Sequence, residues 1–101
     1  MTLFAFIYRP GPAWIEGKPM QEQALGPHVE FMQRLQDEGR LLVAGPLLET
    51  NGGIAVVRAK DKREADGLLA GDPAVTSGIF LADAHSWYLA FGAGTPVGAA
   101  N

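Results

Sequence analysis

Apolar and polar residues alternate along the chain in a way that divides it into six elements. Four short apolar runs bounded by turn residues are typical of β-strands and lie at residues 3–8, 41–47, 54–59 and 79–91. Two further segments, residues 21–38 and 61–71, place their apolar residues at helical spacing. The order β-α-β-β-α-β predicts an α+β, ferredoxin-like domain whose antiparallel sheet carries both helices on one face.

Residues with distinct backbone preferences mark the boundaries of the helices. Pro27 divides the first helical segment, so either the regular helix starts there with Pro27 in its first turn, or Pro27 kinks a longer helix. Gly39 suits the left-handed conformation in which many helices end. Asp61 followed by Glu64 is similar to a capping box, and this pair predicts the start of the second helix.

Both faces of the predicted sheet are apolar. In the first strand, one face carries Leu3, Ala5 and Ile7, and the other carries Phe4, Phe6 and Tyr8. The second strand repeats this pattern, with Leu41 and Val43 opposite Leu42 and Ala44. A sheet with one solvated face would alternate apolar and polar residues, and two helices can cover only one face. Because so large an apolar patch is rare on a monomer, we expect a homodimer of two copies packed face to face.

Composition narrows the classes of protein that this chain can be. Its 101 residues make one small domain, which we expect to span residues 1–91, with a flexible tail at 92–101. Eight Lys and Arg against eleven Asp and Glu give a net charge of -3, the wrong sign for a simple nucleic-acid binder. The absence of Cys excludes disulfides and thiolate catalysis. No apolar run could span a membrane and no signal peptide is visible, so a cytoplasmic location is expected.

His28 and Asp72 are the residues best suited to acid-base chemistry. His28 lies on the apolar stripe near the start of the first helix, where partial burial favours a neutral imidazole that can accept a proton. Asp72 continues the apolar stripe of the second helix, and a core-facing carboxylate needs a partner. Because both helices pack on one face, the carboxylate could hold one imidazole nitrogen and make the other a better base.

Each of these two residues also has a structural interpretation. His28 at a helix start could serve only packing and hydrogen bonding. Asp72 before Pro73 is a good N-cap for one further helical turn through Val75. The capping role and a functional role of Asp72 can coexist, so the sequence leaves both open.

Five further residues are candidates for contacts with a substrate. Arg9 could hold an anionic group, and the rings of Tyr8 and Trp14, beside the loop that follows the first strand, could stack on a ring. Gly45 and Pro46 bend the second strand and indicate a bulge or an edge position beside a pocket. Ordinary loop packing is the alternative for each of these residues taken alone.

Asp83 and His85 lie two residues apart on the last predicted strand, so their side chains share one face. They could add a polar pair to a pocket or bind a metal. The favoured interpretation is that they are polar residues at a strand end or at the rim of a dimer. With two His and no Cys in the chain, no metal site is expected.

Three stretches carry the most specific motifs: residues 28–35 (HVEFMQRL), 39–47 (GRLLVAGPL) and 71–80 (GDPAVTSGIF). Together with the opening YRPGP at 8–12, they resemble the YCII-related (YciI-like) domain family, and the resemblance spans nearly the whole chain. It implies a dimeric α+β barrel of two ferredoxin-like sheets packed face to face. It also implies a pocket in which His28 and Asp72 form the proposed catalytic pair.

The chain departs from the family pattern at two positions. Pro27 directly before His28 is not a general feature, so the entry to the helix is expected to differ. Ala74 stands where an aromatic residue is common after Asp-Pro. The smaller side chain is expected to widen the pocket or change its specificity.

These residues predict a small cofactor-independent enzyme of lyase or isomerase type, acting on a small, aromatic or lactone-like molecule. His28 is the expected general base, and Asp72 is expected to orient its ring. The alternative is a non-catalytic, dimeric ligand-binding or regulatory module that uses the same pocket. Conversion of a bound ligand would distinguish the enzyme from this module. A third interpretation, a purely structural dimerisation domain, requires the region around both residues to be packed solid.

Overall fold

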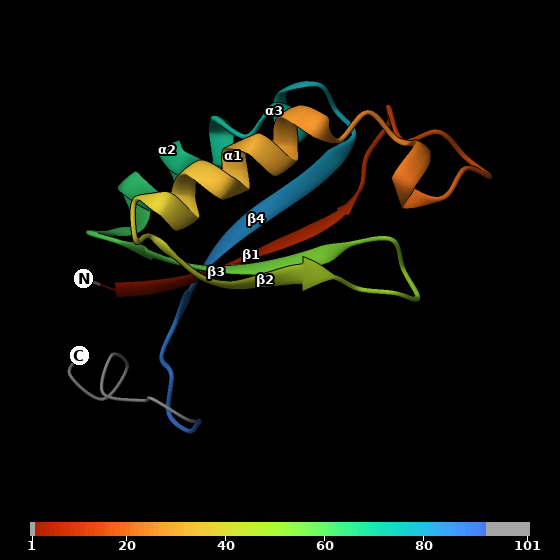
Figure 1. Ribbon diagram of the computed structural model, residues 1–101. Helices are drawn as coiled ribbons and strands as arrows, with labels where there is room; N and C mark the ends of the chain where they lie inside the picture. Colours follow the sequence, from red (N-terminus) through yellow and green to blue (C-terminus); the bar gives the residue numbers. More distant parts are fainter. Residues whose placement is uncertain (1, 93–101) are drawn as a thin grey trace.

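The computed structural model describes residues 2–92 as a four-stranded antiparallel sheet with helices on one side (Figure 1). The order across the sheet is β2-β3-β1-β4, formed by β1 (Thr2–Pro10), β2 (Leu41–Pro46), β3 (Gly53–Ala59) and β4 (Phe80–Trp87). The helices are η1 (Met20–Glu22), a 3-10 helix, and α1 (Gly26–Asp37), α2 (Lys62–Ala70) and α3 (Pro73–Thr76). Figure 1 shows α1, α2 and α3 over the same face of the sheet. The predicted α+β, ferredoxin-like architecture is confirmed.

Local sequence explains where the helices begin and end. Pro27 occupies the first turn of α1, so the helix starts there, and residues 20–22 form the separate helix η1. Gly39 follows α1 with a φ of 75°, the left-handed conformation predicted for it. The Asp61 carboxylate accepts a hydrogen bond from the Glu64 N–H at the start of α2. Of the two alternatives for Pro27, the structure therefore shows the helix start, and α2 begins after Asp61 as predicted.

The hydrophobic core lies between the sheet and the helices. Phe4, Phe6 and Tyr8 alternate along β1, point to the covered face and are all buried. The buried helix residues in the same core are Phe31, Leu35, Ala65 and Leu69. This packing fixes α1 and α2 against the sheet, and so fixes the side chains at their ends.

A register shift in β2 corrects one detail of the predicted sheet. Leu41 pairs with Val57 and Val43 pairs with Val56, so one extra residue lies between them. Val57 and Val56 point to opposite faces, so Leu41 packs against the core while Val43 is exposed on the other side. The prediction that Leu41 and Val43 share a face is therefore wrong. The strand does lie at the sheet edge, which was one of the two positions that Gly45 indicated.

The second face of the sheet carries no helix among residues 2–92. Its exposed apolar side chains are Ile7, Val43, Ile54, Leu81 and Trp87. An ion pair between Arg9 and Asp83, at 3.1 Å, crosses from β1 to β4 on this face. β4 ends at Trp87, earlier than the predicted residue 91. A single copy thus leaves part of an apolar sheet surface exposed, although Leu3 and Val56 on the same face are buried.

The loop between β1 and η1 folds back on the covered face of the sheet. Trp14 is buried, with its ring centroid 5.8 Å from that of Phe80. The Gln23 carboxamide ties the loop down, because it accepts the N–H of Ile15 and donates to the carbonyls of Ile15 and Lys18. The loop is therefore ordered by its own contacts and forms a fixed wall next to η1.

The predictions about a membrane span and about the C-terminal tail depend on which residues the structure describes. Within residues 2–92, no helix combines the length and the apolar character needed to cross a membrane. The tail predicted for residues 92–101 lies outside the described residues, apart from Gly92. The domain boundary at residue 91 therefore stays a prediction.

Candidate active site

Asp72 is a fully buried carboxylate that accepts hydrogen bonds from three segments of the chain. It is the N-cap of α3, where its Oδ1 accepts the N–H of Ala74 at 2.9 Å. Its Oδ2 accepts the Tyr8 hydroxyl of β1, also at 2.9 Å. The predicted capping role is confirmed, and it leaves the carboxylate free to bond other groups. A buried carboxylate with several donors is held in one orientation.

His28 supplies the third donor, from the first turn of α1. Its Nδ1 lies 2.8 Å from Asp72 Oδ2 and 3.0 Å from Oδ1. Because both carboxylate oxygens are acceptors, Nδ1 carries the proton and donates it, which assigns the tautomer of the ring. Nε2 is then left with a lone pair, on the side of the ring away from Asp72. The His28 side chain is 17% exposed, so part of its ring is within reach of a small molecule.

Aromatic rings hold the imidazole of His28 from two sides. The Tyr8 ring centroid lies 5.5 Å away and that of Phe80 lies 5.8 Å away, each at an interplanar angle of 73°. Such edge-to-face contacts are favourable and restrict rotation of the ring. Packing and the hydrogen bond to Asp72 therefore fix the direction of Nε2 before any ligand binds.

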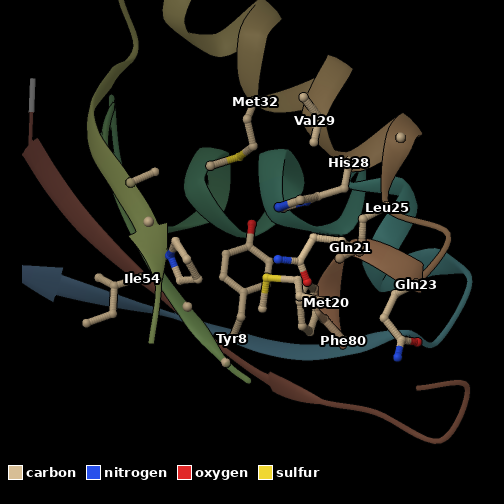
Figure 2. A pocket seen from close by; sticks show the side chains of 16 residues that line it. Tyr8, Met20, Gln21, Gln23, Leu25, His28, Val29, Met32, Ile54 and Phe80 are labelled. Atoms are coloured by element: carbon tan, nitrogen blue, oxygen red, sulfur yellow. The ribbon is translucent and has the colours of Figure 1, made fainter. Parts of the chain in front are cut away.

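A pocket of about 540 Å³ opens beside His28, between α1, η1 and the β2–β3 hairpin (Figure 2). Met20, Leu25, Met32 and Phe80 contribute to its apolar walls. This volume and this apolar lining are typical of sites for small molecules. The cavity does not fit a purely structural domain, which would be packed solid at this point.

The structure brings four of the seven predicted site residues to the pocket wall. Tyr8, His28, Gly45 and Pro46 line it, and Asp72 lies directly behind Tyr8 and His28. The Tyr8 hydroxyl bonds the Asp72 carboxylate, a contact that the sequence interpretation of Tyr8 as a stacking residue did not include.

The structure places the remaining candidates away from the pocket. Arg9 lies on the uncovered face of the sheet, paired with Asp83, so it is not positioned to hold an anionic group in this pocket. Trp14 is buried in the core and does not line the pocket. His85 lies opposite Ala5 on the uncovered face. Within residues 2–92, no three His, Asp or Glu side chains gather to hold a metal ion.

Sequence reasoning missed two contributions to the site. The alternation of Tyr8 with Phe4 and Phe6 was a usable signal, since it places the phenol on the helix-covered face where Asp72 also lies. Gln21 lines the pocket from η1, but it sits in a short segment with no periodic pattern, so nothing in the sequence singled it out.

Tyr8 should make the fold sensitive to alkaline pH. Burial first, and then the charge of Asp72 and the hydrogen bond to it, raise the pKa of the Tyr8 phenol well above its usual value. Below about pH 10, both the folded and the unfolded chain keep this proton. Above that pH the unfolded chain loses the proton and the folded chain retains it. The free energy of unfolding should therefore fall by about 1.4 kcal/mol per pH unit in this range.

The Tyr8→Phe variant separates this effect from other titrations. It loses the hydrogen bond to Asp72, so we expect it to be less stable at neutral pH by about 1 kcal/mol. It should lack the additional alkaline loss, because it has no phenol to ionise. Urea unfolding of both proteins between neutral and alkaline pH measures the difference. Parallel declines in the two proteins would contradict the assignment of this effect to Tyr8.

Known proteins resemble this chain in sequence and in fold. The sequence model of the YCII-related domain family matches residues 2–84 of this chain. An uncharacterised protein of Bacillus subtilis (strain 168), YjpA, is 39% identical over 69 residues, or 68% of this chain and 80% of that protein. Among solved structures, the 5-chloro-2-hydroxyhydroquinone dehydrochlorinase TftG of Burkholderia phenoliruptrix AC1100, in complex with 2,5-dihydroxybenzoquinone, has a TM-score of 0.60 at 19% identity. That similarity covers 83% of this chain and 92% of that chain, and it shows a shared fold.

The family match contains both motifs that supply the buried pair. The segment that begins at His28 and the segment that contains Asp72 both lie within residues 2–84. The resemblance stated from the sequence is thus confirmed over most of the chain. This protein belongs to the YCII-related domain family.

Proposed function

We propose that this protein is a small-molecule enzyme of lyase or isomerase type in which His28 acts as the general base. The observation that carries the proposal is the 2.8 Å contact between His28 Nδ1 and the buried Asp72, at the wall of an open apolar pocket. The bound substrate presents an acidic proton to Nε2, which takes it. Asp72 holds the imidazole in the correct tautomer and stabilises the imidazolium that forms.

The apolar pocket supports this chemistry in two ways. It removes water from around the base and the substrate, so electrostatic interactions between them are stronger than in solution. It also holds the acidic proton near a base that is already oriented, which removes much of the entropic cost of the encounter. The proton returns from Nε2 to another atom of the substrate in an isomerisation, or leaves with the departing group in an elimination.

The dehydrochlorinase that shares this fold suggests the first substrate to try. Removal of HCl requires a base to accept a proton, a role that His28 could fill. We therefore expect 5-chloro-2-hydroxyhydroquinone and related ring phenols and lactones to be informative candidates. This step rests on a shared fold at 19% identity, so it selects compounds for a test.

A conversion assay tests the proposed function. Compounds that raise the melting temperature of the protein are incubated with it, and their conversion is followed by NMR and, for chlorinated compounds, by chloride release. The proposal expects at least one of them to be converted by the wild type and not by a His28 variant. Binding without conversion across the set would favour the non-catalytic module, whose ligand would occupy the same pocket.

We propose further that two copies associate through the uncovered sheet face. Ile7 and Ile54 pair across β1 and β3 and are exposed at 36% and 38%. Leu81 of β4, 42% exposed, lies on the same face opposite Arg9, beside the Arg9–Asp83 ion pair. Burying apolar area of this kind stabilises an association, and a chain of 101 residues gains from the added burial. The resulting homodimer keeps the pocket on the helix-covered face of each copy.

An Ile7→Lys variant is expected to convert the dimer to a folded monomer. Ile7 is already partly exposed in a single copy, so the lysine can reach water without disturbing the core. In the dimer it would bury a charge opposite Asp83, which is already paired with Arg9, so its loss of water is costly. Light scattering during size-exclusion chromatography measures the mass. Gln33→Lys, on the exposed side of α1, is the control and should leave the dimer intact; a monomeric wild type contradicts the proposal.

A further inference from the structure

The side chains on the wall of the pocket are mostly apolar. Among residues 2–92, no Lys, Arg, Asp or Glu lines it. Its polar side chains are Tyr8, Gln21, Gln23 and His28. A charged ligand group would therefore lose water in this pocket without gaining an opposite charge.

Two of these four polar side chains are already engaged inside the protein. The Tyr8 hydroxyl donates to Asp72. The Gln23 carboxamide is bonded to the main chain at Ile15 and Lys18. The polar side chains left to recognise a ligand are therefore His28 and Gln21.

Gln21 approaches the pocket from η1, on a different side from α1. Figure 2 shows its carboxamide turned into the pocket, in the direction of the Tyr8 ring. It takes no part in the bonds that fix Gln23 to the loop. A carboxamide can donate as well as accept a hydrogen bond, so it complements a base that only accepts.

We propose that Gln21 is a specificity-determining residue, and that the substrate is an uncharged, ring-sized molecule with an acidic proton and a conjugated oxygen acceptor. The acidic proton faces His28 Nε2 and the oxygen accepts the Gln21 N–H. This assignment rests on the proposed function, because it places the substrate against the same base. It adds the substrate class and the residue that selects it.

The proton transfer explains why the acceptor oxygen should be conjugated. When Nε2 takes the proton from an O–H or C–H group, the bonding pair stays on the substrate, and conjugation carries the negative charge to the oxygen near Gln21. The Gln21 N–H then donates to an oxygen that has become more negative, so its hydrogen bond strengthens during the step. No other donor side chain on the pocket wall is free to do this.

The carboxylate behind the base supports the exclusion of anions. Asp72 is fully buried directly behind His28, and no positively charged side chain lines the pocket to offset it. The cavity of about 540 Å³ is large enough for a substituted ring. Met20, Met32 and Phe80 offer polarisable surfaces that suit the faces of such a ring.

Three probes of matched size test the proposal by NMR titration of the full chain at neutral pH. 4-Hydroxyacetophenone carries an O–H and a conjugated carbonyl, 4-ethylphenol lacks the carbonyl, and 4-hydroxybenzoate replaces it with a carboxylate. We expect 4-hydroxyacetophenone to bind about fivefold more tightly than 4-ethylphenol and to shift both the His28 ring and the Gln21 side-chain amide signals. 4-Hydroxybenzoate should bind more than about tenfold more weakly than 4-hydroxyacetophenone.

Gln21 is exposed, so substitutions at this position should leave the fold unchanged and affect only ligand binding. Gln21→Leu should remove the preference for 4-hydroxyacetophenone and leave the affinity for 4-ethylphenol within about twofold of the wild type. Gln21→Lys should improve the binding of 4-hydroxybenzoate, because it supplies the missing positive charge. Gln36→Leu, an exposed glutamine of α1 that does not line the pocket, is the control and should change none of these affinities.

Clear results would overturn the assignment. Equal binding of 4-hydroxybenzoate, a preference that survives in Gln21→Leu, or the absence of any shift at His28 and Gln21 each contradicts it. Failure of the proposed function looks different, because it appears as a lack of conversion in the enzyme assay. A His28→Asn variant should still show the Gln21-dependent preference, so recognition can be measured when the base is absent.

Discussion

An asparagine in place of His28 is expected to lower the rate of substrate conversion by about 10²–10⁴-fold while the chain still folds. The expectation follows from the geometry of the side chain. The amide nitrogen of asparagine occupies nearly the position of the imidazole Nδ1, so it can still donate to the buried Asp72. It has no equivalent of Nε2, so the only free base on the pocket wall is lost.

His28→Asn is more informative than His28→Ala for this reason. The alanine variant removes the base and also a donor to a buried carboxylate, so a loss of activity could come from a change in structure. Circular dichroism and the melting temperature report the fold, and the initial rate of conversion reports the base. His85→Asn, at an exposed position on the other side of the sheet, is the matched control and should keep the wild-type rate. A rate within tenfold of the wild type in His28→Asn contradicts the role of His28.

The direction of the His28 side chain was predictable from the sequence because it follows from helical periodicity. His28 shares an apolar stripe with Leu25, Met32 and Leu35, so the helix that buries them also turns His28 towards the sheet. Asp72 was predicted to continue the stripe of the second helix, but α2 ends at Ala70, and Asp72 reaches the core as the N-cap of α3. Two helices on one face of a sheet then place both side chains in the same layer.

The errors in the predicted site have a different physical origin. Tyr8 and Arg9 are neighbours in a strand, so they must point to opposite faces, and only one of them can reach a pocket on the helix side. Applying that alternation would have assigned Arg9 to the uncovered face from the sequence. The position of Trp14 depends on how its loop closes, and the register of Leu41 depends on a bulge. Neither is encoded in a local period.

Gln21 illustrates what local patterns omit. A glutamine in a short helix between two loops has no stripe and no motif to mark it. Its place on the pocket wall arises because the fold brings η1 next to α1 and the β2–β3 hairpin, while the nearby Gln23 bonds to the main chain of the loop. A site assembled from three separate segments therefore becomes visible only when their spatial arrangement is known.

Substitutions of Asp72 are expected to separate its structural role from its role in orienting the base. In Asp72→Ala, the Tyr8 hydroxyl and the Ala74 N–H lose their acceptors inside the core, and α3 loses its cap. We expect the free energy of unfolding to fall by about 2–4 kcal/mol, measured by urea denaturation. Asp66→Asn, which removes the charge of an exposed ion pair on α2, is the control and should change stability by less than about 0.5 kcal/mol.

Asp72→Asn is expected to keep most of the stability and lose the activity. If its carbonyl oxygen keeps the hydrogen bond to the Ala74 N–H, its amide group replaces Oδ2 and faces Tyr8 and His28. The amide donates, so Nδ1 of His28 must become the acceptor and the proton moves to Nε2. The nitrogen that faces the substrate then has no lone pair, and the rate should fall by about 10²–10⁴-fold.

The tautomer itself can be measured without a substrate. Nitrogen-15 shifts distinguish a protonated from an unprotonated imidazole nitrogen, and His85 serves as an internal reference because it makes no contact with Asp72. The wild type should show the proton of His28 on Nδ1, and Asp72→Asn should show it on Nε2. An unchanged tautomer together with an unchanged rate would mean that the carboxylate serves α3 and Tyr8 alone. A changed tautomer with an unchanged rate would mean that Nε2 is not the atom that takes the proton.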